Sequence, residues 1–316
     1  MKNLKKEIDV VGLGVSTLDF LNIVDHFPEK EEVQKSYMLK LEGGGPIATA
    51  VVALSRLGAK TAMIDCLGDD WIGKKIIEEF SNEKVISSYI KINKGRTSST
   101  ASILVRKNDG ARTIVYSPGD SPELSEDDLP AELIAKSKYL HINGRHFTAC
   151  KKAVELAKQY DTKITFDGGS NRFEDEHSEI IPNTDVCIFT KDYATKYSNT
   201  FDIYNAANLI LGNGPELVVI TDGIDGSHLF TKKIRGYHQK AFSMKNVVDT
   251  TGCGDCYHGA FLYGLCKSKN LYDAILFASA AAALNTQKLG GRSALPTVDE
   301  VEKFIDVRAK QKKIEI

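Results

Sequence analysis

The chain has 316 residues, of which 42% are hydrophobic and 26% are charged, so its length suits one large α/β unit or two ordinary domains. The 41 basic and 42 acidic residues leave a net charge of -1, which argues against a protein held on nucleic acid or on a membrane by bulk charge. Six cysteines are too few for a disulfide scaffold, and no apolar run reaches the roughly 18 residues of a transmembrane helix. We therefore expect a cytoplasmic globular protein with reduced thiols.

Strand-like and helix-like segments alternate along most of the chain. Residues 8–15 form a β-branched run punctuated by glycine, and 46–57 are expected to be a helix that begins at Pro46 and ends before Gly58. Further strands are expected at 61–66, 139–143, 163–167, 186–190 and 217–221, and further helices at 254–266, 271–288 and 297–310. This alternation predicts a mostly parallel sheet with helices on both faces.

Two stretches interrupt the alternation, because 19–41 and 97–117 look like strands without helices between them. Within the second stretch, Asn108-Asp109-Gly110 separates two β-rich runs and indicates a hairpin. We expect these stretches to form a small antiparallel β lid beside the main sheet, which closes an active site or makes a dimer contact. The predicted organisation is one domain over residues 1–316 that includes this lid.

The segment 247–261 carries the clearest chemical signal. Gly252 and Gly254 precede an apolar helical run, and glycines at a helix start allow backbone N–H groups to converge on an anion. Asp255 lies at this junction, where a carboxylate can accept the proton of an attacking hydroxyl. Taken alone, Asp255 is equally well explained as a helix cap.

The longer string resolves that ambiguity. Asp-Thr-Thr-Gly-Cys-Gly-Asp at 249–255, followed by Gly-Ala-Phe at 259–261, resembles the C-terminal signature of the ribokinase-like, or PfkB, carbohydrate kinases. The glycine-rich segment 43–50, Leu-Gly-Ala at 57–59 and the Gly-Asp-Asp block within 67–73 resemble further family motifs, in the family's order. The resemblance runs from about residue 8 to residue 296. The sequence departs from the family at Cys253, where alanine is usual, and at Ala48, where many members have asparagine.

This resemblance implies an ATP-dependent sugar kinase that phosphorylates a primary hydroxyl. Asp255 is then the general base, and the backbone of Gly252, Cys253 and Gly254 is the anion hole. The residues expected to position the sugar are Asp19, Gly43, Gly44, Arg145 and Asp167. Other interpretations stay open for single residues: Asp19 as a turn residue, Arg145 as a surface arginine and His146 as a structural histidine.

The resemblance also implies a nucleotide side and its ions. The expected ATP contacts are Thr221, Gly223, Gly226 and Gly291. Many relatives hold Mg²⁺ near an Asn-x-x-Glu pair, but residues 190–193 read Thr-Lys-Asp-Tyr here, so we expect magnesium to be held through the ATP phosphates and water. A monovalent cation, K⁺, is implied near Asp249 and Thr251. Family lids often pair, which makes a homodimer the expected assembly.

The acceptor is less defined than the chemistry. The segment 43–50, Arg145, residues 257–260 and the Gly-Gly-Arg string at 290–292 are most similar to the sulfofructose-kinase branch, which favours an anionic ketohexose derivative. Plain fructose or ribose stays possible. A nucleoside kinase of the same fold is the alternative enzyme, with Phe20, Tyr37 and Tyr116 available for stacking. A regulator that binds sugar or nucleotide without catalysis is the remaining alternative, and the intact Asp255 speaks against it.

Three further patterns imitate known sites. Residues 68–75 nearly spell a P-loop, but Lys75 replaces the required hydroxyl residue. The Gly-Leu-Gly at 12–14 lacks the third glycine of a dinucleotide fingerprint. Cys253 and Cys256 are spaced like a zinc or redox pair, yet the chain offers no good second ligand pair nearby. We expect none of the three patterns to be functional.

Overall fold

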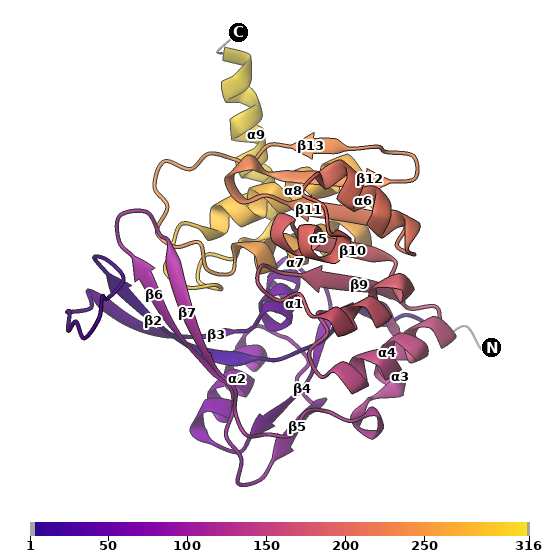
Figure 1. The fold of residues 1–316 in the computed structure, drawn as a ribbon, viewed down its shortest axis with the longest axis horizontal. Coiled ribbons are helices and arrows are strands. Elements are labelled where there is room, and N and C mark those ends of the chain that lie inside the picture. The colour runs from indigo at the N-terminus through magenta and orange to yellow at the C-terminus, as the bar shows by residue number, and fades with distance from the viewer. Residues whose placement is uncertain (1–3, 315–316) are drawn as a thin grey trace.

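The computed structural model describes the backbone of residues 4–314 and the side chains of residues 4–309, and its strands form two sheets (Figure 1). The larger sheet contains, in spatial order, β13 (Tyr237–Gln239), β12 (Ser227–Thr231), β11 (Leu217–Thr221), β10 (Val186–Thr190), β9 (Lys163–Gly168), β8 (Ser137–Ile142), β1 (Ile8–Leu13), β4 (Thr61–Gly68) and β5 (Ile90–Asn93). Neighbouring strands from β11 to β5 are parallel, whereas β12 and β13 add an antiparallel edge.

Helices cover both faces of this sheet, as the alternating pattern predicted. One face packs against α1 (Pro46–Arg56), α2 (Trp71–Asn82), α7 (Cys253–Cys266), α8 (Leu271–Asn285) and α9 (Val298–Ile314). The other face packs against α3 (Ala131–Ala135), α4 (Phe147–Gln159), α5 (Lys191–Ser198) and α6 (Ile203–Gly212). Gly259 allows α7 to lie close to α1, since a Cβ there would stand 2.5 Å from the Ala50 carbonyl oxygen. The α/β fold class predicted from the sequence is confirmed.

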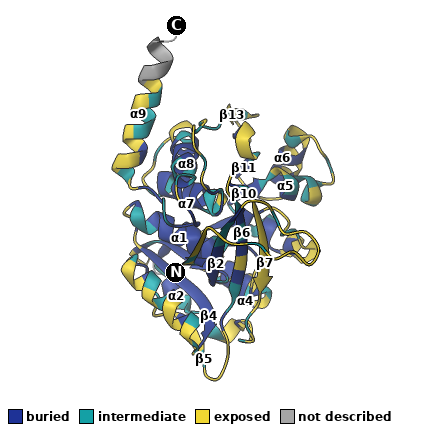
Figure 2. Ribbon diagram, turned by 90° about the vertical axis from the view of Figure 1, so that its left-hand side faces the viewer, coloured by how far each residue is buried: buried dark blue, intermediate teal, exposed yellow. Residues whose placement is uncertain are grey.

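The smaller sheet consists of β3 (Met38–Gly44), β2 (Thr17–Val24), β6 (Thr100–Arg106) and β7 (Arg112–Ser117). The outer pairs β2–β3 and β6–β7 are antiparallel, while β2 and β6 are parallel. Its inner face forms a separate apolar cluster in which Leu21 and Ile103 pack with Leu289, which follows α8. The strand β7 is exposed along its whole length (Figure 2).

Several boundaries differ from the sequence-based expectation. The expected helix over 271–288 ends at Asn285, because the chain then turns toward the small sheet and places Leu289 there. The short edge strands β12 and β13 and the helix α2 were not predicted as separate elements. Both edge strands are short and partly exposed, so they lack the continuous apolar run that indicates a buried strand.

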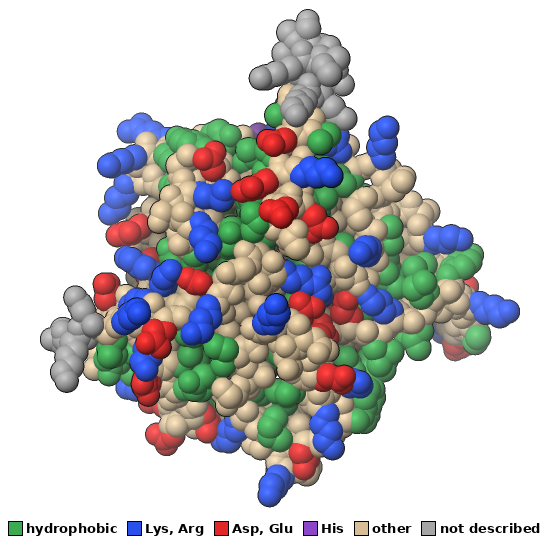
Figure 3. Space-filling view, turned by 180° about the vertical axis from the view of Figure 1, so that it is seen from behind, with side chains coloured by type: hydrophobic (Ala, Val, Ile, Leu, Met, Phe, Trp, Pro, Cys, Tyr) green, Lys and Arg blue, Asp and Glu red, His purple; other side chains and the backbone are tan. Residues whose placement is uncertain are grey.

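The surface matches the balanced charge of the sequence. Figure 3 shows basic and acidic side chains interspersed over the face opposite that of Figure 1. Within residues 4–314, no helix combines the length and apolar character needed to cross a membrane.

Candidate active site

The loop before α7 has the geometry of an anion-binding helix start. Gly252 caps the helix in the left-handed region, with φ 69° and ψ 0°, and a Cβ there would lie 2.6 Å from the Gly291 Cα. Only glycine suits this position. The amides of Gly254 and Asp255 lie in the first helical turn, where no intrahelical acceptor exists, whereas the Cys253 amide donates to the Thr250 carbonyl at 3.4 Å.

Asp255 projects from this first turn and is mostly buried, with 20% of its side chain exposed. Burial raises the pKa of Asp255, while the positive charge of Arg172 opposes that shift. The Arg172 Nη2 lies 4.0 Å from Asp255 Oδ1. A carboxylate with a raised pKa is a stronger base than an ordinary aspartate, which suits the proton-accepting role predicted for Asp255.

Arg172 is a site residue that the sequence did not single out. It lies between two carboxylates, because its Nη1 is 3.6 Å from Asp167 Oδ2 while its Nη2 approaches Asp255. The buried Nη1 has no hydrogen-bond acceptor. Gly169 leaves room for this guanidinium, since a Cβ there would stand 2.0 Å from Arg172 Nη2. The Gly168-Gly169 pair at the end of β9 was therefore the available signal.

Asp19 lies on β2 with 7% exposure and accepts a hydrogen bond of 2.6 Å from the Thr17 hydroxyl. Burial raises the pKa of Asp19 to about 6, and the negative charge of Asp255 adds to that shift. Gly44 is adapted to this carboxylate, since a Cβ at Gly44 would lie 2.1 Å from Asp19 Oδ2. The structure therefore brings Asp19, Gly44 and Asp255 into one region.

Arg292 explains why residue 43, next to Gly44, is a glycine. Although it is only 1% exposed, its Nη1 donates to Glu79 Oε1 at 3.0 Å and its Nη2 donates to the Gly44 carbonyl at 2.8 Å. A Cβ at Gly43 would lie 2.3 Å from Arg292 Nη1. The Gly-Gly-Arg string thus places its arginine under the Gly43–Gly44 backbone, which it fixes in place.

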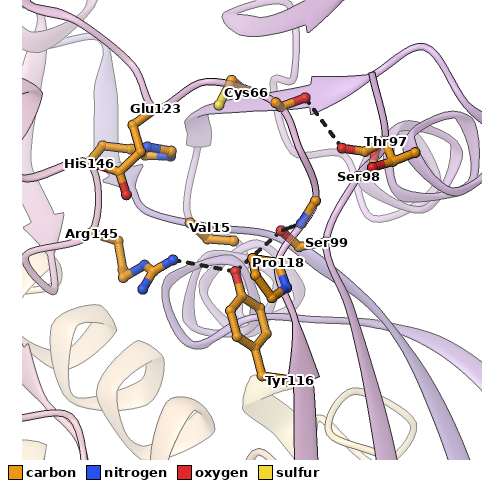
Figure 4. A pocket seen from close by; sticks show the side chains of 12 residues that line it. Val15, Cys66, Thr97, Ser98, Ser99, Tyr116, Pro118, Glu123, Arg145 and His146 are labelled. Atoms are coloured by element: carbon orange, nitrogen blue, oxygen red, sulfur yellow. Dashed lines mark hydrogen bonds between the residues drawn. The ribbon is translucent and has the colours of Figure 1, made fainter. Parts of the chain in front are cut away.

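Arg145 lies beside a pocket of about 110 Å³. Figure 4 shows its guanidinium directed at Tyr116, to whose hydroxyl it donates at 3.4 Å. Of the three aromatic residues considered for stacking, only Tyr116 lines this pocket. Phe20 packs against Trp71, and the Tyr37 hydroxyl donates to Asp25.

His146 is nearby but fully engaged in the fold. Its Nδ1 accepts from the Leu124 amide, so its Nε2 carries the proton and donates to the buried Asp65 at 3.0 Å. This pairing agrees with the structural role expected for His146.

The predicted nucleotide residues lie beyond β11. Thr221 ends this strand, Gly223 begins the short helix η4 (Gly223–Asp225), and Gly226 follows with φ 101°. A Cβ at Gly226 would stand 2.1 Å from the Gln239 carbonyl oxygen. Gly291 lies elsewhere, with its backbone against Gly252. Their contacts with ATP stay predictions.

Asp249 is completely buried and orders the loop before α7. Its Oδ1 accepts from the Thr251 amide at 2.7 Å, and its Oδ2 accepts from the Gly290 amide at 2.8 Å. Close by, the Thr251 hydroxyl and the Asn285 side-chain oxygen are buried without partners. This set of oxygen atoms suits a small cation.

Comparison with known proteins defines the family. A family model described as pfkB family carbohydrate kinase matches residues 5–298. The chain belongs to this family. The PfkB chain is 29% identical to a 5-dehydro-2-deoxygluconokinase of Bacillus licheniformis, over 96% of its own length and 97% of the relative. It is 28% identical to the Bacillus subtilis 5-dehydro-2-deoxygluconokinase, over 97% and 98% of the two chains.

Solved structures agree with that assignment. Ribokinase from Thermotoga maritima superposes with a TM-score of 0.82 at 27% identity, covering 95% of this PfkB chain and 99% of the other. Arabidopsis thaliana ribokinase, solved with ribose and ATP, shares the fold with a TM-score of 0.80 at 22% identity, covering 94% and 98%. The predictions of a PfkB carbohydrate kinase and of a ribokinase-like fold are confirmed.

Two of the three imitating patterns have structural roles in this PfkB fold, and the thiols of the third are not activated. In the P-loop-like segment, Asp70 caps α2 by accepting from the Gly73 amide at 2.8 Å. Gly12 gives α1 room to pack, since a Cβ there would lie 2.6 Å from Val51. Burial raises the pKa of Cys253 to about 12 and raises the pKa of Cys256 well above its usual range, so neither thiol is activated as a redox group requires.

Proposed function

We propose that this carbohydrate kinase transfers the γ-phosphoryl group of ATP to the primary hydroxyl of an anionic keto-sugar derivative, with Asp255 as the general base. The observation that carries the proposal is the Asp255 carboxylate itself. It has a raised pKa, lies in the first turn of α7 and has the Arg172 guanidinium 4.0 Å away.

The reaction uses this geometry in one displacement. Asp255 accepts the hydroxyl proton while the acceptor oxygen forms its bond to the γ-phosphorus, and the bond to the β,γ-bridging oxygen breaks to release ADP. The amides at the start of α7 and the Arg172 guanidinium stabilise the negative charge on the transferring group. Arg112 of the small sheet donates to the Thr250 hydroxyl at 2.8 Å, so the small sheet contacts the catalytic loop as a lid does.

Magnesium bound to the ATP phosphates neutralises their charge when the nucleotide is present. The segment 190–193 does not offer an acidic pair for it. Thr190 caps α5, Lys191 pairs with Asp222 at 2.7 Å, and Asp192 accepts from the Asn171 amide. Because these side chains already have partners within the protein, we infer that magnesium is held through the ATP phosphates and water.

Two arginines favour an anionic acceptor. Arg145 is exposed beside the pocket, and Arg172 has an unsatisfied Nη1 that lies 3.6 Å from Asp167. Guanidinium groups suit carboxylate and sulfonate oxygens. The 5-dehydro-2-deoxygluconokinases are named for a keto derivative of a gluconic acid, which is an acid of this kind. Sulfofructose, favoured by the motif resemblance, is a second anionic acceptor to compare.

An ADP-release assay over a panel of acceptors tests the proposal. We expect turnover with 5-dehydro-2-deoxygluconate or sulfofructose to exceed turnover with fructose, ribose and adenosine. Arg145→Gln should raise KM for the anionic acceptor by about ten-fold or more and leave KM for a neutral sugar unchanged. A preference for adenosine, or for a neutral sugar, would contradict the proposed acceptor class.

Asp255→Asn tests the base separately from binding. We expect kcat to fall by about two to four orders of magnitude, as is typical for loss of a general base, while ATP binding measured by calorimetry is retained. Asp127→Asn, an exposed site with the same charge change, is the matched control. Near-normal turnover in Asp255→Asn would contradict the role of Asp255 as the general base. If the wild type turns over no acceptor, the alternative of a non-catalytic regulator that binds sugar or nucleotide is favoured.

We also propose that K⁺ binds beside Asp249. The supporting observation is the pair of buried oxygen atoms without partners, Thr251 Oγ1 and Asn285 Oδ1, next to a carboxylate with no exposure. Kinase activity should rise when KCl replaces tetramethylammonium chloride at equal ionic strength. Equal activity in the two salts would contradict this cation site.

We further propose a homodimer formed through the lid, on the ground that the small sheet exposes apolar side chains. Leu39 is 59% exposed and Val115 is 65% exposed, and large exposed apolar residues on a sheet favour burial against a partner. Light scattering should give about twice the mass of the chain. A monomer at micromolar concentration would contradict this assembly.

A further inference from the structure

A second group of titratable side chains lies directly behind Asp255. His141 comes from β8, Asp167 from the end of β9, and His258 from α7. We call these three residues the inner cluster. They are 0%, 3% and 3% exposed, respectively, and one ligand-type atom from each lies within 4.8 Å of the others. No step of the proposed reaction uses the two histidines.

The inner cluster leaves several polar atoms without partners. His141 Nε2 and His258 Nδ1 are buried and make no hydrogen bond. The buried Asp167 oxygens also lack a hydrogen-bond partner at ordinary distance, and the guanidinium of Arg172 lies 3.6 Å from Oδ2. Within the inner cluster, His258 Nε2 and Asp167 Oδ1 lie 3.7 Å apart. This distance between the histidine nitrogen and the carboxylate oxygen is too long for a hydrogen bond. Buried polar groups are rarely left unpaired because each costs roughly 1–3 kcal/mol. This arrangement therefore indicates a bound group between the three side chains.

The hydrogen bonds of His141 direct one of its ring nitrogens into the inner cluster. His141 Nδ1 lies 2.8 Å from the Thr165 hydroxyl, whose own proton is directed at the Leu140 carbonyl. Nδ1 therefore carries the proton of His141, which leaves the Nε2 lone pair directed into the cluster.

The charges favour a cation. Asp167 and Asp255 carry two negative charges when ionised, and Arg172 supplies one positive charge within 3.6 Å and 4.0 Å of them. When both carboxyls are ionised, these three side chains together carry a net charge of -1 before a ligand enters. Two imidazoles and one carboxylate are the donors that divalent first-row transition metals prefer, whereas Mg²⁺ prefers oxygen atoms alone.

We propose that the inner cluster is a binding site for a divalent transition metal ion of the Zn²⁺ class, held by His141, Asp167 and His258. Metal bonds of roughly 2.0–2.2 Å in a tetrahedral site place neighbouring ligand atoms about 3.4 Å apart. The 3.7 Å between His258 Nε2 and Asp167 Oδ1 is close to that value. The ion would join β8, β9 and α7 beneath the catalytic base and leave one coordination position for water.

Zinc binding to the full chain is the primary test. We expect isothermal titration with ZnCl₂ to show one equivalent bound in the presence of MgCl₂, and elemental analysis to find that equivalent after gel filtration. His141→Gln and His258→Gln should each weaken Zn²⁺ binding by about a hundred-fold or more. The double variant His228→Gln, His238→Gln is the matched control, because those two stacked rings lie 4.3 Å apart at the edge of the sheet and should not contribute.

Cobalt keeps the proposal testable if a variant does not fold, which circular dichroism would reveal. Co²⁺ bound to the wild-type protein should give visible d–d bands without the near-ultraviolet thiolate band that Cys253 or Cys256 would produce. The proposal is overturned by a thiolate band, by the absence of stoichiometric Zn²⁺ and Co²⁺ binding, or by binding that is lost only in the control double variant. Because these readouts do not use kinase activity, their failure is distinct from failure of the proposed reaction.

Discussion

Asp19→Asn should make the protein more stable at neutral pH while weakening its acceptor binding. Burial raises the pKa of the Asp19 carboxyl from 3.8 to about 6, so ionisation of Asp19 is unfavourable in the folded state. Asparagine has nearly the same shape, keeps an oxygen for the Thr17 hydroxyl and carries no charge. The substitution therefore removes the cost of a buried charge without disturbing the fit against Gly44.

The magnitude and sign follow from the two pKa values. Between about pH 4 and pH 6 the folded protein retains a proton that the unfolded chain has released, so the wild-type free energy of unfolding falls as pH rises through this window. The difference of about two pKa units corresponds to about 3 kcal/mol. The stability advantage of Asp19→Asn should therefore be near zero at pH 4 and reach about 3 kcal/mol at pH 7.

The assay is thermal unfolding of both proteins from pH 4 to pH 7, because titrating groups that do not interact with Asp19 cancel in the difference between them. An advantage of about 3 kcal/mol corresponds to a rise of about 5 °C in Tm at pH 7, and Asp127→Asn, an exposed position, should show no such trend. Acceptor KM should increase at the same time. A Tm difference that is constant across this pH range, or that falls as pH rises, would refute the argument that burial raises the pKa of Asp19. Unchanged acceptor kinetics would refute the role of Asp19 in acceptor binding.

Two glycine substitutions test the close contacts of the site and the core. Gly44→Ala places a Cβ 2.1 Å from Asp19 Oδ2, so it should displace that carboxylate and lower kcat/KM for the acceptor by about ten-fold or more. The control Gly212→Ala meets open space and should leave the kinetics unchanged. Equal kinetics in the two variants would contradict the close contact at Gly44. Gly259→Ala forces α7 away from α1, where a Cβ meets a carbonyl at 2.5 Å, and denaturant unfolding should show a loss of about 1–3 kcal/mol. Wild-type stability in Gly259→Ala would show that α7 moves without cost.

Much of the fold was predictable from the sequence, because its signals are local. The alternation of β-branched runs with helical segments indicated the parallel sheet, and three of its central strands have the predicted bounds to within one residue. The conformation of the loop before α7 was predictable for a related reason. Gly252 must adopt φ 69°, and a backbone requirement of this kind restricts the residue type at that position alone.

The tertiary structure decided how distant side chains meet. Arg292 stood out in the sequence only as part of the Gly-Gly-Arg string. Its amide donates to Glu42 and its guanidinium to Glu79 and the Gly44 carbonyl, all more than 200 positions away. Arg172 reads as an ordinary loop arginine until the ends of β9 and α7 bring Asp167 and Asp255 beside it.

The inner cluster has the same origin. Its three residues are separated in sequence, and only adjacent strands β8 and β9, covered by α7, bring their buried atoms together. Length, composition and motifs determined that the chain is an α/β carbohydrate kinase with a glycine-rich loop before α7. Which charges are buried beside that loop, and hence the pKa of Asp19 and Asp255, depends on long-range packing, because desolvation is a property of all the atoms around a group and not of its neighbours in the chain.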